Sequence, residues 1–376
     1  RLQMEESPAF KKMKEEGATS KAPLAEAFGQ WKNARVVLFA LLGLVAGHVG
    51  PTLSARAVVS QGCPHTGPRR RRARALPAGR RHCPTLRQVS ETVRQIRVHG
   101  RSVRVAHRSG TGVPLVVCNG IGASLDLLQP FVDALDESIP VIRFDVPGIG
   151  GSDQPRCPYS FVTLAWTLGK VLDELGVTTF DVLGISWGGG LAQQVALQNP
   201  RRCRRLVLVS TGTGAMMVPG HPKVLSKMLT PRRYRDPEYA ASVAATLYGG
   251  EMREDPELAE RILDGHAPRT SGRGYRLQLL AGTGWSSLPY LPLLPQRTLI
   301  MAGDDDPIIP LINARIMHRA IRRSQLHVYP DGHLALVSRA WDLAPRVARF
   351  LREDYLPRAP ETLGLAHRPG GRELYA

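Results

Sequence analysis

A serine set between two glycines constrains this chain more than any other feature. Residues 179–185 form an apolar run too short for an ordinary helix, which passes through Gly184, Ser186 and Gly188 into a helical pattern. A strand that turns sharply into a helix at Gly-x-Ser-x-Gly is a nucleophile elbow, whose strained serine exposes its hydroxyl above the sheet. The motif alone fits equally well a glycine-rich connection with an incidental serine, so the rest of the chain has to decide.

Strands and helices alternate on both sides of this turn. This alternation predicts an α/β fold with a mostly parallel sheet that is covered by helices on both faces. Residues 211–294 interrupt it with helical stretches separated by Pro and Gly, which we interpret as a helical lid inserted after the strand that follows the elbow. The apolar patterns predict strands at 103–107, 114–118, 141–145, 179–185, 205–210, 297–302 and 325–329, and helices at 125–135, 161–175, 311–321 and 341–352.

The segment before residue 90 differs from the rest. Residues 1–100 carry 12 of the 18 net positive charges, and residues 51–86 are rich in Arg, Pro and Gly without apolar periodicity, which predicts disorder. A tail that binds nucleic acid or an anionic surface is the functional alternative. The apolar run 36–46 is shorter than the about 20 residues that a membrane span needs, and a signal-peptide core is the other interpretation of it.

Residues 1–47 resemble the cytoplasmic loop and helix start of a major-facilitator metabolite transporter, in the stretches 7–24 and 27–33. A single broken span cannot transport anything, so we expect no functional membrane span, and residues 1–89 are either part of the mature protein or a fusion or gene-model artefact. The predicted organisation is a non-family extension at 1–89 with an Arg-rich part at 69–81, a core at 90–210, a lid at 211–294, a second core part at 295–356 and a flexible tail at 357–376.

Composition excludes some classes of function for the main part of the chain. Its charges are mixed and no basic stretch is interleaved with aromatic residues, which argues against a nucleic-acid interface. The five cysteines are odd in number and lack paired C-x-x-C spacing, so we expect a reducing compartment and no zinc site.

A serine hydroxyl needs a base, and the base needs a carboxylate that orients it. In an elbow-type sheet these residues follow the serine in the order acid, then histidine. The strand ending at residue 302 runs into three aspartates, of which we choose Asp306, with Asp305 as the alternative and Asp304 as a helix cap. For the base we choose His333, because, of the histidines after the elbow and outside the tail, it alone lies in the loop after the last strand, at the sheet edge where Ser186 emerges.

The negative oxygen of the reaction intermediate needs backbone N–H donors. One donor is expected at Trp187, directly after the nucleophile, and the other at Ile121, in the glycine-containing loop after residue 118. The Trp187 ring is expected to pack against the lid or the substrate channel.

Several motifs together resemble the intracellular poly(3-hydroxyalkanoate) depolymerases, which are α/β-hydrolases that cut medium-chain-length storage polyester on cytoplasmic granules. The resemblance covers roughly residues 90–355, and its motifs lie at 119–123, 144–152, 184–189, 217–225 and 302–307. It implies the α/β-hydrolase fold, and Ser186, Asp306 and His333 as a catalytic triad that needs no cofactor or metal.

The implied activity is hydrolysis of polyester ester bonds through an acyl-enzyme, with release of 3-hydroxyacyl monomers or oligomers. The implied partner is the apolar polyester at the granule surface, and the implied location is cytoplasmic. The alternatives are a carboxylesterase or lipase for small acyl esters, and a granule-associated protein without catalytic activity.

Overall fold

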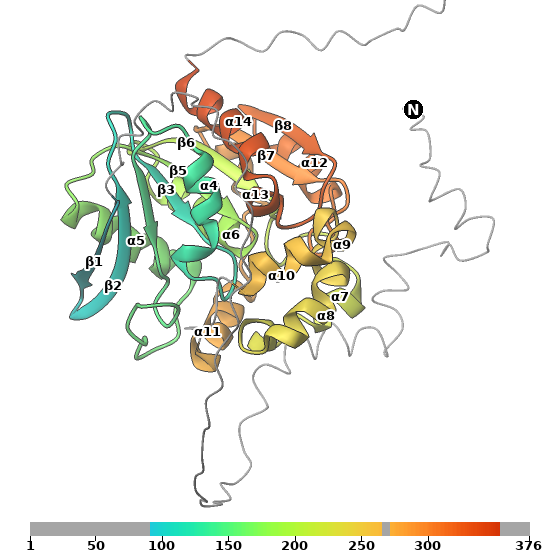
Figure 1. Ribbon diagram of the computed structural model, residues 1–376. Helices are drawn as coiled ribbons and strands as arrows, with labels where there is room; N and C mark the ends of the chain where they lie inside the picture. The colour runs from blue at the N-terminus through green and yellow to red at the C-terminus, as the bar shows by residue number, and fades with distance from the viewer. Residues whose placement is uncertain (1–90, 265–270, 354–376) are drawn as a thin grey trace, which may run out of the picture. The chain divides into compact units, whose positions relative to one another are not determined.

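A twisted sheet forms the centre of the molecule in the computed structural model, which describes residues 91–264 and 271–353 (Figure 1). The predictions for residues 1–89, including the apolar run 36–46 and the Arg-rich part 69–81, and for the tail 357–376 lie outside the described residues. The strands of the described sheet are β1 (Glu91–Val98), β2 (Arg101–Arg108), β3 (Leu115–Cys118), β4 (Val141–Phe144), β5 (Phe180–Ile185), β6 (Cys203–Val209), β7 (Arg297–Gly303) and β8 (Ser324–Tyr329).

The strand order is β1-β2-β4-β3-β5-β6-β7-β8. Strand β2 is antiparallel to both of its neighbours, and all pairings from β4 to β8 are parallel. The carboxyl ends of the parallel strands therefore meet at one edge of the sheet, where an α/β fold places its functional residues.

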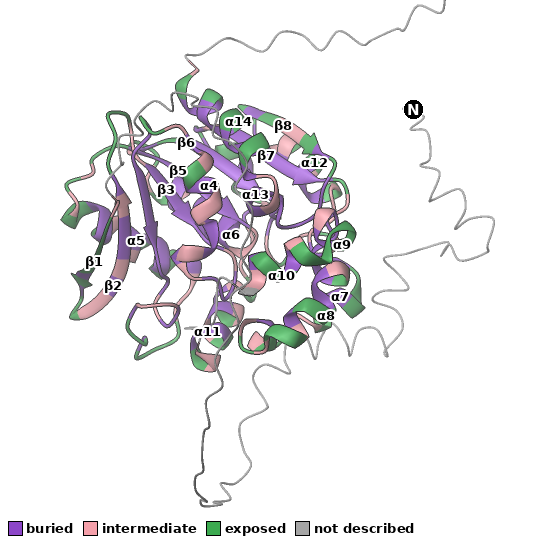
Figure 2. Cartoon of the chain, in the orientation of Figure 1, coloured by how far each residue is buried: buried purple, intermediate pink, exposed green. Residues whose placement is uncertain are grey.

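The central strands are buried because helices cover both faces of the sheet (Figure 2). Successive residues belong to opposite faces: Val116 and Val182 lie in one apolar cluster, and Val117 and Leu183 in the other. One cluster takes in side chains of α5 (Phe161–Glu174), α6 (Trp187–Gln198) and α12 (Ile312–Ala320), and the other those of η1 (Leu125–Leu128), α4 (Gln129–Ala134), α13 (Ala335–Ser338) and α14 (Ala340–Arg352).

Between β6 and β7 the chain forms a helical lid, which gathers below the sheet in the view of Figure 1. Its side chains Val243, Leu247 and Met252 belong to the same apolar cluster as β5 and α14, so the lid is packed onto the core. The lid elements are α7 (Pro222–Ser226), η2 (Pro231–Tyr234), α8 (Pro237–Tyr248), α9 (Glu251–Glu254), α10 (Pro256–Asp264), α11 (Gly272–Gly282) and η3 (Leu291–Leu293).

The predicted strands and helices are present, with three differences, of which one is the short helix α13, which was not predicted. Strand β1 was not predicted, because it is an edge strand of which only Ile96 and Val98 are buried, so its apolar pattern is short. The helix predicted at 125–135 is divided into η1 and α4, because Pro130 fits the first turn of a helix but not its interior. No helix of the described residues is long and apolar enough to cross a membrane.

Candidate active site

Ser186 lies at the turn between strand β5 and helix α6. Its backbone has φ 55° and ψ −124°, a left-handed conformation that is strained for a residue with a side chain. Hydrogen bonds hold the turn from both sides: the Ser186 N–H donates to the carbonyl of Val209 at 3.0 Å, and the Thr211 hydroxyl donates to the carbonyl of Ser186 at 2.7 Å. The local geometry is therefore that of a nucleophile elbow.

The two glycines of the motif are required by contact distances. A Cβ atom on Gly184 would lie 2.3 Å from the carbonyl oxygen of Gly188, and one on Gly188 would lie 2.2 Å from the carbonyl oxygen of Cys118. Atoms cannot approach so closely without displacing the backbone. Glycine at both positions lets helix α6 pack directly against strands β5 and β3.

His333 and Asp306 form a buried pair at the same edge of the sheet. The Nδ1 atom of His333 lies 2.7 Å from Oδ2 of Asp306, and their side chains are 4% and 1% exposed. The other carboxylate oxygen of Asp306 accepts from the N–H groups of Ile308 and Ile309, at 2.9 Å each. With Nδ1 facing the carboxylate, Nε2 is the ring nitrogen left to exchange a proton with another group.

Asp305 and Asp304 do not contact His333. The Asp305 carboxylate accepts from the Gly250 N–H at 2.7 Å and pairs with Arg253 at 2.8 Å, and its side chain is 45% exposed. Asp304 is exposed. Of the three aspartates in this loop, the structure brings Asp306 to the histidine.

Ser186 and His333 line one cavity between the core and the lid. The cavity has a volume of about 30 Å³. Its core wall includes Ile121 and Ile308, and its lid wall is formed by Met228, Arg233, Tyr234, Tyr248 and Leu263. The elbow, the loop after β8 and the lid therefore meet at this cavity.

The expected N–H donors lie beside this cavity. Trp187 is the first residue of helix α6, and the first N–H groups of a helix have no acceptor within it. Ile121 lies in the loop after β3, where a Cβ on the neighbouring Gly120 would be 3.6 Å from the Ser186 Cβ. Both residues are thus next to the serine, from the two elements that the sequence indicated.

Gln278 of lid helix α11 contacts both donor segments. Its side-chain oxygen accepts from the Gly122 N–H at 2.7 Å, and its carbonyl accepts from the indole N–H of Trp187 at 2.8 Å. Gln278 is fully buried. The Trp187 ring thus bonds to the lid, as expected, and it also lies 4.7 Å from the ring of Phe161, centroid to centroid.

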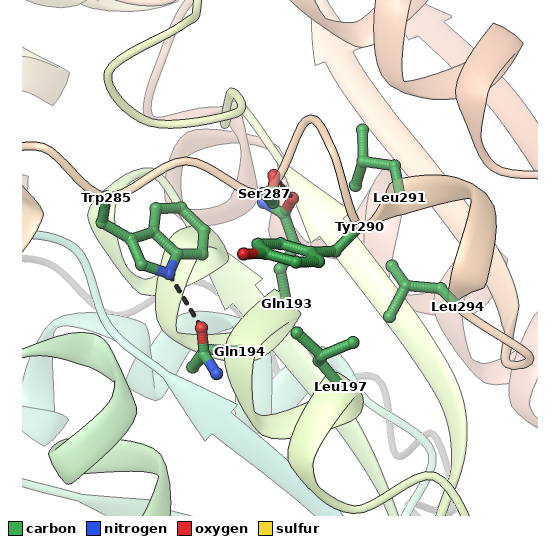
Figure 3. A pocket seen from close by; sticks show the side chains of 8 residues that line it. All are labelled: Gln193, Gln194, Leu197, Trp285, Ser287, Tyr290, Leu291 and Leu294. Atoms are coloured by element: carbon green, nitrogen blue, oxygen red, sulfur yellow. Dashed lines mark hydrogen bonds between the residues drawn. The ribbon is translucent and has the colours of Figure 1, made fainter.

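The end of the lid is fixed to the middle of helix α6 (Figure 3). The Trp285 indole donates to the Gln194 side chain at 2.8 Å, and the Ser287 hydroxyl donates to the Gln193 side chain at 2.6 Å. Gln193 in turn donates to the carbonyls of Gly189 and Gly212, at 3.0 Å each. The elbow helix is therefore held by the lid at its first turn and again near its middle.

Two of the other histidines after the elbow have structural contacts. His221 accepts the Lys223 N–H at the start of α7, and His318 bonds the Ser324 hydroxyl. His327 lies within strand β8, where burial lowers its pKa, and His266 lies outside the described residues. No cluster of potential metal ligands occurs in the parts of the chain that the structure describes. The described cysteines, Cys118, Cys157 and Cys203, are free thiols.

Four site residues were missed at the sequence level: Gln278, Arg233, Tyr234 and Asp331. Three are lid residues in stretches without a motif, so no local signal identifies them. Asp331 stands two residues before His333, and its carboxylate accepts from the N–H groups of Gly332 and Glu251, at 2.6 and 2.8 Å. An acid so close to a candidate catalytic histidine was a usable signal for a residue that orders its loop.

The chain is similar to known proteins over this same region. Residues 113–340 match the family model of the alpha/beta hydrolase fold. The poly(3-hydroxyalkanoate) depolymerase of Ectopseudomonas oleovorans is 50% identical over 244 residues, which cover 64% of this chain and 85% of that protein. The 2-hydroxymuconate semialdehyde hydrolase of Pseudomonas sp. (strain CF600) is 28% identical over 274 residues, covering 66% of this chain and 89% of that protein.

A solved structure confirms the fold. The enol-lactonase from Burkholderia xenovorans LB400 superimposes with a TM-score of 0.60 at 23% identity, covering 69% of this chain and all of that one. The family model, the sequence relatives and the solved structure all indicate an alpha/beta hydrolase. The chain belongs to the alpha/beta hydrolase family and, within it, to the same group as the poly(3-hydroxyalkanoate) depolymerases.

Proposed function

We propose that this protein hydrolyses the ester bonds of medium-chain-length poly(3-hydroxyalkanoate) and releases 3-hydroxyacyl monomers or oligomers. The observation that carries the proposal is the 50% identity to a poly(3-hydroxyalkanoate) depolymerase over 85% of its length. The cavity shared by Ser186 and His333 supports it, because a serine beside a histidine–carboxylate pair is the arrangement that acyl transfer requires.

In the proposed mechanism, the Ser186 hydroxyl attacks the ester carbonyl while His333 takes its proton at Nε2. Asp306 keeps the imidazole in the required tautomer and stabilises its charged form. His333 then gives the proton to the departing alkoxide, which leaves as the free hydroxyl of the released chain. A water molecule, activated by the same histidine, attacks the acyl-enzyme and frees the acid and Ser186.

The N–H groups of Trp187 and Ile121 are the proposed donors to the negative oxygen that forms during each attack. Donors fixed before the reaction stabilise this charge without the cost of reorganising solvent. The contacts of Gln278 with Gly122 and Trp187 support this proposal, because they hold both donor segments in position.

Access to the cavity requires the lid to move. Sites for ligands of moderate size have volumes of about 300–1,000 Å³, whereas this cavity has about 30 Å³. A polyester chain therefore cannot occupy it in the present conformation. We expect the lid helices to open for the chain to enter.

The proposed location is the cytoplasm, at the surface of polyester granules. Apolar side chains on the outside of the lid support contact with an apolar surface: Met216 is 59% exposed, Leu229 49% and Val218 42%. Transfer of such side chains from water to the polyester is favourable.

One experiment separates this function from its alternatives. The protein is incubated with medium-chain polyester granules and, separately, with short p-nitrophenyl esters, using Ser186→Ala as the control, and the acids released are identified by mass spectrometry. The proposal predicts 3-hydroxy acids from granules with the wild type and none with the variant. Activity confined to the small esters would support a general esterase instead. Unchanged granule turnover by Ser186→Ala would support a non-catalytic protein.

A further inference from the structure

One arginine of the lid is buried in the wall of the catalytic cavity. Arg233, in η2, is 4% exposed and lines the same cavity as Ser186 and His333. Its chain neighbours Arg232 and Arg235 are exposed. The fold thus turns a single guanidinium of this basic stretch towards the reaction site, where an apolar side chain would suit an entirely apolar substrate better.

The contacts of Arg233 are with aromatic rings and hydroxyls. Its Nη1 donates to the Tyr275 hydroxyl at 2.9 Å, and its guanidinium carbon lies 4.5 Å from the ring centroid of Tyr234 and 5.4 Å from that of Tyr275. The Nε–H has no hydrogen-bond partner. Among the described residues, no carboxylate lies within ion-pair distance of this guanidinium.

The surrounding phenols do not neutralise the charge. Burial raises the pKa of Tyr275 and of Tyr248, although Arg233 itself lowers both, so these side chains stay uncharged near neutral pH. An arginine in a protein keeps its proton. The cavity therefore contains a positive charge that has lost most of its water and has no counter-ion in the described chain, an arrangement that an anionic ligand would stabilise.

Resting on the proposed function, we propose that Arg233 binds the terminal carboxylate of the polyester or oligomer, so that cleavage proceeds from the carboxyl end. A carboxylate is the anion that such a chain carries, and a guanidinium binds it through two parallel hydrogen bonds. In the terminal 3-hydroxyacyl unit, the carboxylate carbon is three bonds from the ester oxygen. The carboxylate and the ester oxygen are thus parts of one unit, and Arg233 and Ser186 line one cavity.

The chemistry of this step is that of the proposed hydrolysis. Ser186 Oγ forms a bond to the carbonyl carbon of the penultimate unit, and the bond from that carbon to the 3-oxygen of the terminal unit breaks. The 3-oxygen takes the proton from His333, so the terminal unit leaves as a free 3-hydroxyalkanoate. Water then releases the shortened chain, whose new carboxylate can bind Arg233 in the next cycle.

The test compares two substrates that differ only at the chain end: the dimer of 3-hydroxyoctanoic acid as the free acid, and the same dimer as its methyl ester. Only cleavage of the internal ester is counted, by chromatography of the products. The wild type is expected to cleave the free acid with a kcat/KM at least tenfold higher. In Arg233→Gln this ratio is expected to fall to about one, and Arg233→Lys is expected to keep part of it.

The matched control is Arg232→Gln, which removes the same charge from an exposed neighbour paired with Asp236 and is expected to retain the wild-type ratio. Because each ratio comes from one protein preparation, a partly unfolded variant loses both rates together and the ratio remains interpretable. Equal cleavage of the two dimers by the wild type would overturn the inference, and so would an undiminished preference in Arg233→Gln. If the wild type cleaves granules and both dimers without preference, only the assignment of Arg233 fails; if it cleaves none of them, the proposed function fails.

A separate measurement needs no variant. Free 3-hydroxyoctanoate is tested against its methyl ester as an inhibitor of p-nitrophenyl ester hydrolysis by the wild type. The proposed carboxylate site predicts a lower inhibition constant for the free acid, by about tenfold. Equal inhibition by the two compounds would contradict the site.

Discussion

The backbone N–H of Gly122 donates a hydrogen bond of 2.7 Å to the side-chain oxygen of Gln278, which joins the loop after β3 to lid helix α11. The same glutamine accepts the indole N–H of Trp187 through its carbonyl. A lid residue thus holds both segments that carry the proposed N–H donors, and the lid is part of the site as well as its cover.

Replacing this glutamine should affect the rate more than binding. Gln278→Met keeps the length of the side chain and removes the acceptor of the Gly122 N–H, so the loop carrying Ile121 keeps its bond from the Tyr234 hydroxyl but loses this one. Because misplacement by about 1 Å costs up to about 100-fold in rate, we expect kcat to fall by about 10- to 100-fold with little change in KM. The measurement is steady-state kinetics on a soluble ester.

The matched control for this change is Gln296→Met. Gln296 is also buried, but it donates to the Ala196 carbonyl at the far end of helix α6. The Gln296→Met variant is expected to have a lower melting temperature than the wild type and a kcat within about twofold of it. Equal loss of kcat in both variants would show that Gln278 acts only through general stability.

The two adjacent aspartates should respond very differently to the same substitution. Asp306→Asn removes the carboxylate that faces His333 and favours the wrong tautomer, which lowers kcat by about 10⁴-fold in a comparable triad. Asp305→Asn removes an exposed ion pair with Arg253, worth at most about 1 kcal/mol, and kcat should stay within a few-fold. Measurement of kcat for both variants decides between them, and a reversed order would make Asp305 the acid.

The elbow glycine should not tolerate a methyl group. In Gly184→Ala, the new Cβ would meet the Gly188 carbonyl oxygen at 2.3 Å, and overpacking of this kind costs about 1–3 kcal/mol or prevents folding. Gly169→Ala in helix α5 is the matched control: a Cβ there meets no atom within 4 Å, and alanine is favoured over glycine in a helix by about 1 kcal/mol. Thermal unfolding should therefore show opposite shifts, and a fall in both melting temperatures would contradict the packing described here.

The described cysteines should differ in reactivity. Burial raises the pKa of the Cys118 and Cys203 thiols, whereas Cys157 is exposed. The thiolate is the reactive form, and its fraction falls about tenfold for each unit by which the pKa rises above the pH. Iodoacetamide at pH 8 should therefore modify Cys157 at least tenfold faster than Cys118 or Cys203, as measured by peptide mass spectrometry. Equal rates in the folded protein would place the two buried strands at the surface.

The sequence contains enough to predict the sheet and the order of the site residues. Continuous apolar strands such as β3 and β5 are recognisable because both of their faces are buried, and the elbow is recognisable because glycine is required at Gly184 and Gly188. Ser186, one acid of the loop 304–306 and His333 follow from the order in which such a fold presents its catalytic residues. Each of these features can be recognised within a short stretch of the sequence.

The lid contributions could not be predicted in the same way. The position of Gln278 opposite Gly122, 156 residues away, depends on how short helices pack on one another. The inward direction of Arg233, between exposed arginines, depends on the single turn of η2. The choice between Asp305 and Asp306 depends on which carboxylate the loop turns inwards. Because the two residues are adjacent and of the same type, the sequence does not distinguish them.

The most direct test of the central claim, that Ser186 is a nucleophile activated by His333 and Asp306, is labelling with a fluorophosphonate. The reagent bonds to an activated serine oxygen and releases fluoride, and tandem mass spectrometry locates the adduct. We predict one adduct on Ser186 within the described residues, none at that position in Ser186→Ala, and labelling at least about 100-fold slower in His333→Ala, since a general base contributes about 10²- to 10⁴-fold. An adduct on a different residue of the core, or labelling of His333→Ala at the wild-type rate, would contradict it.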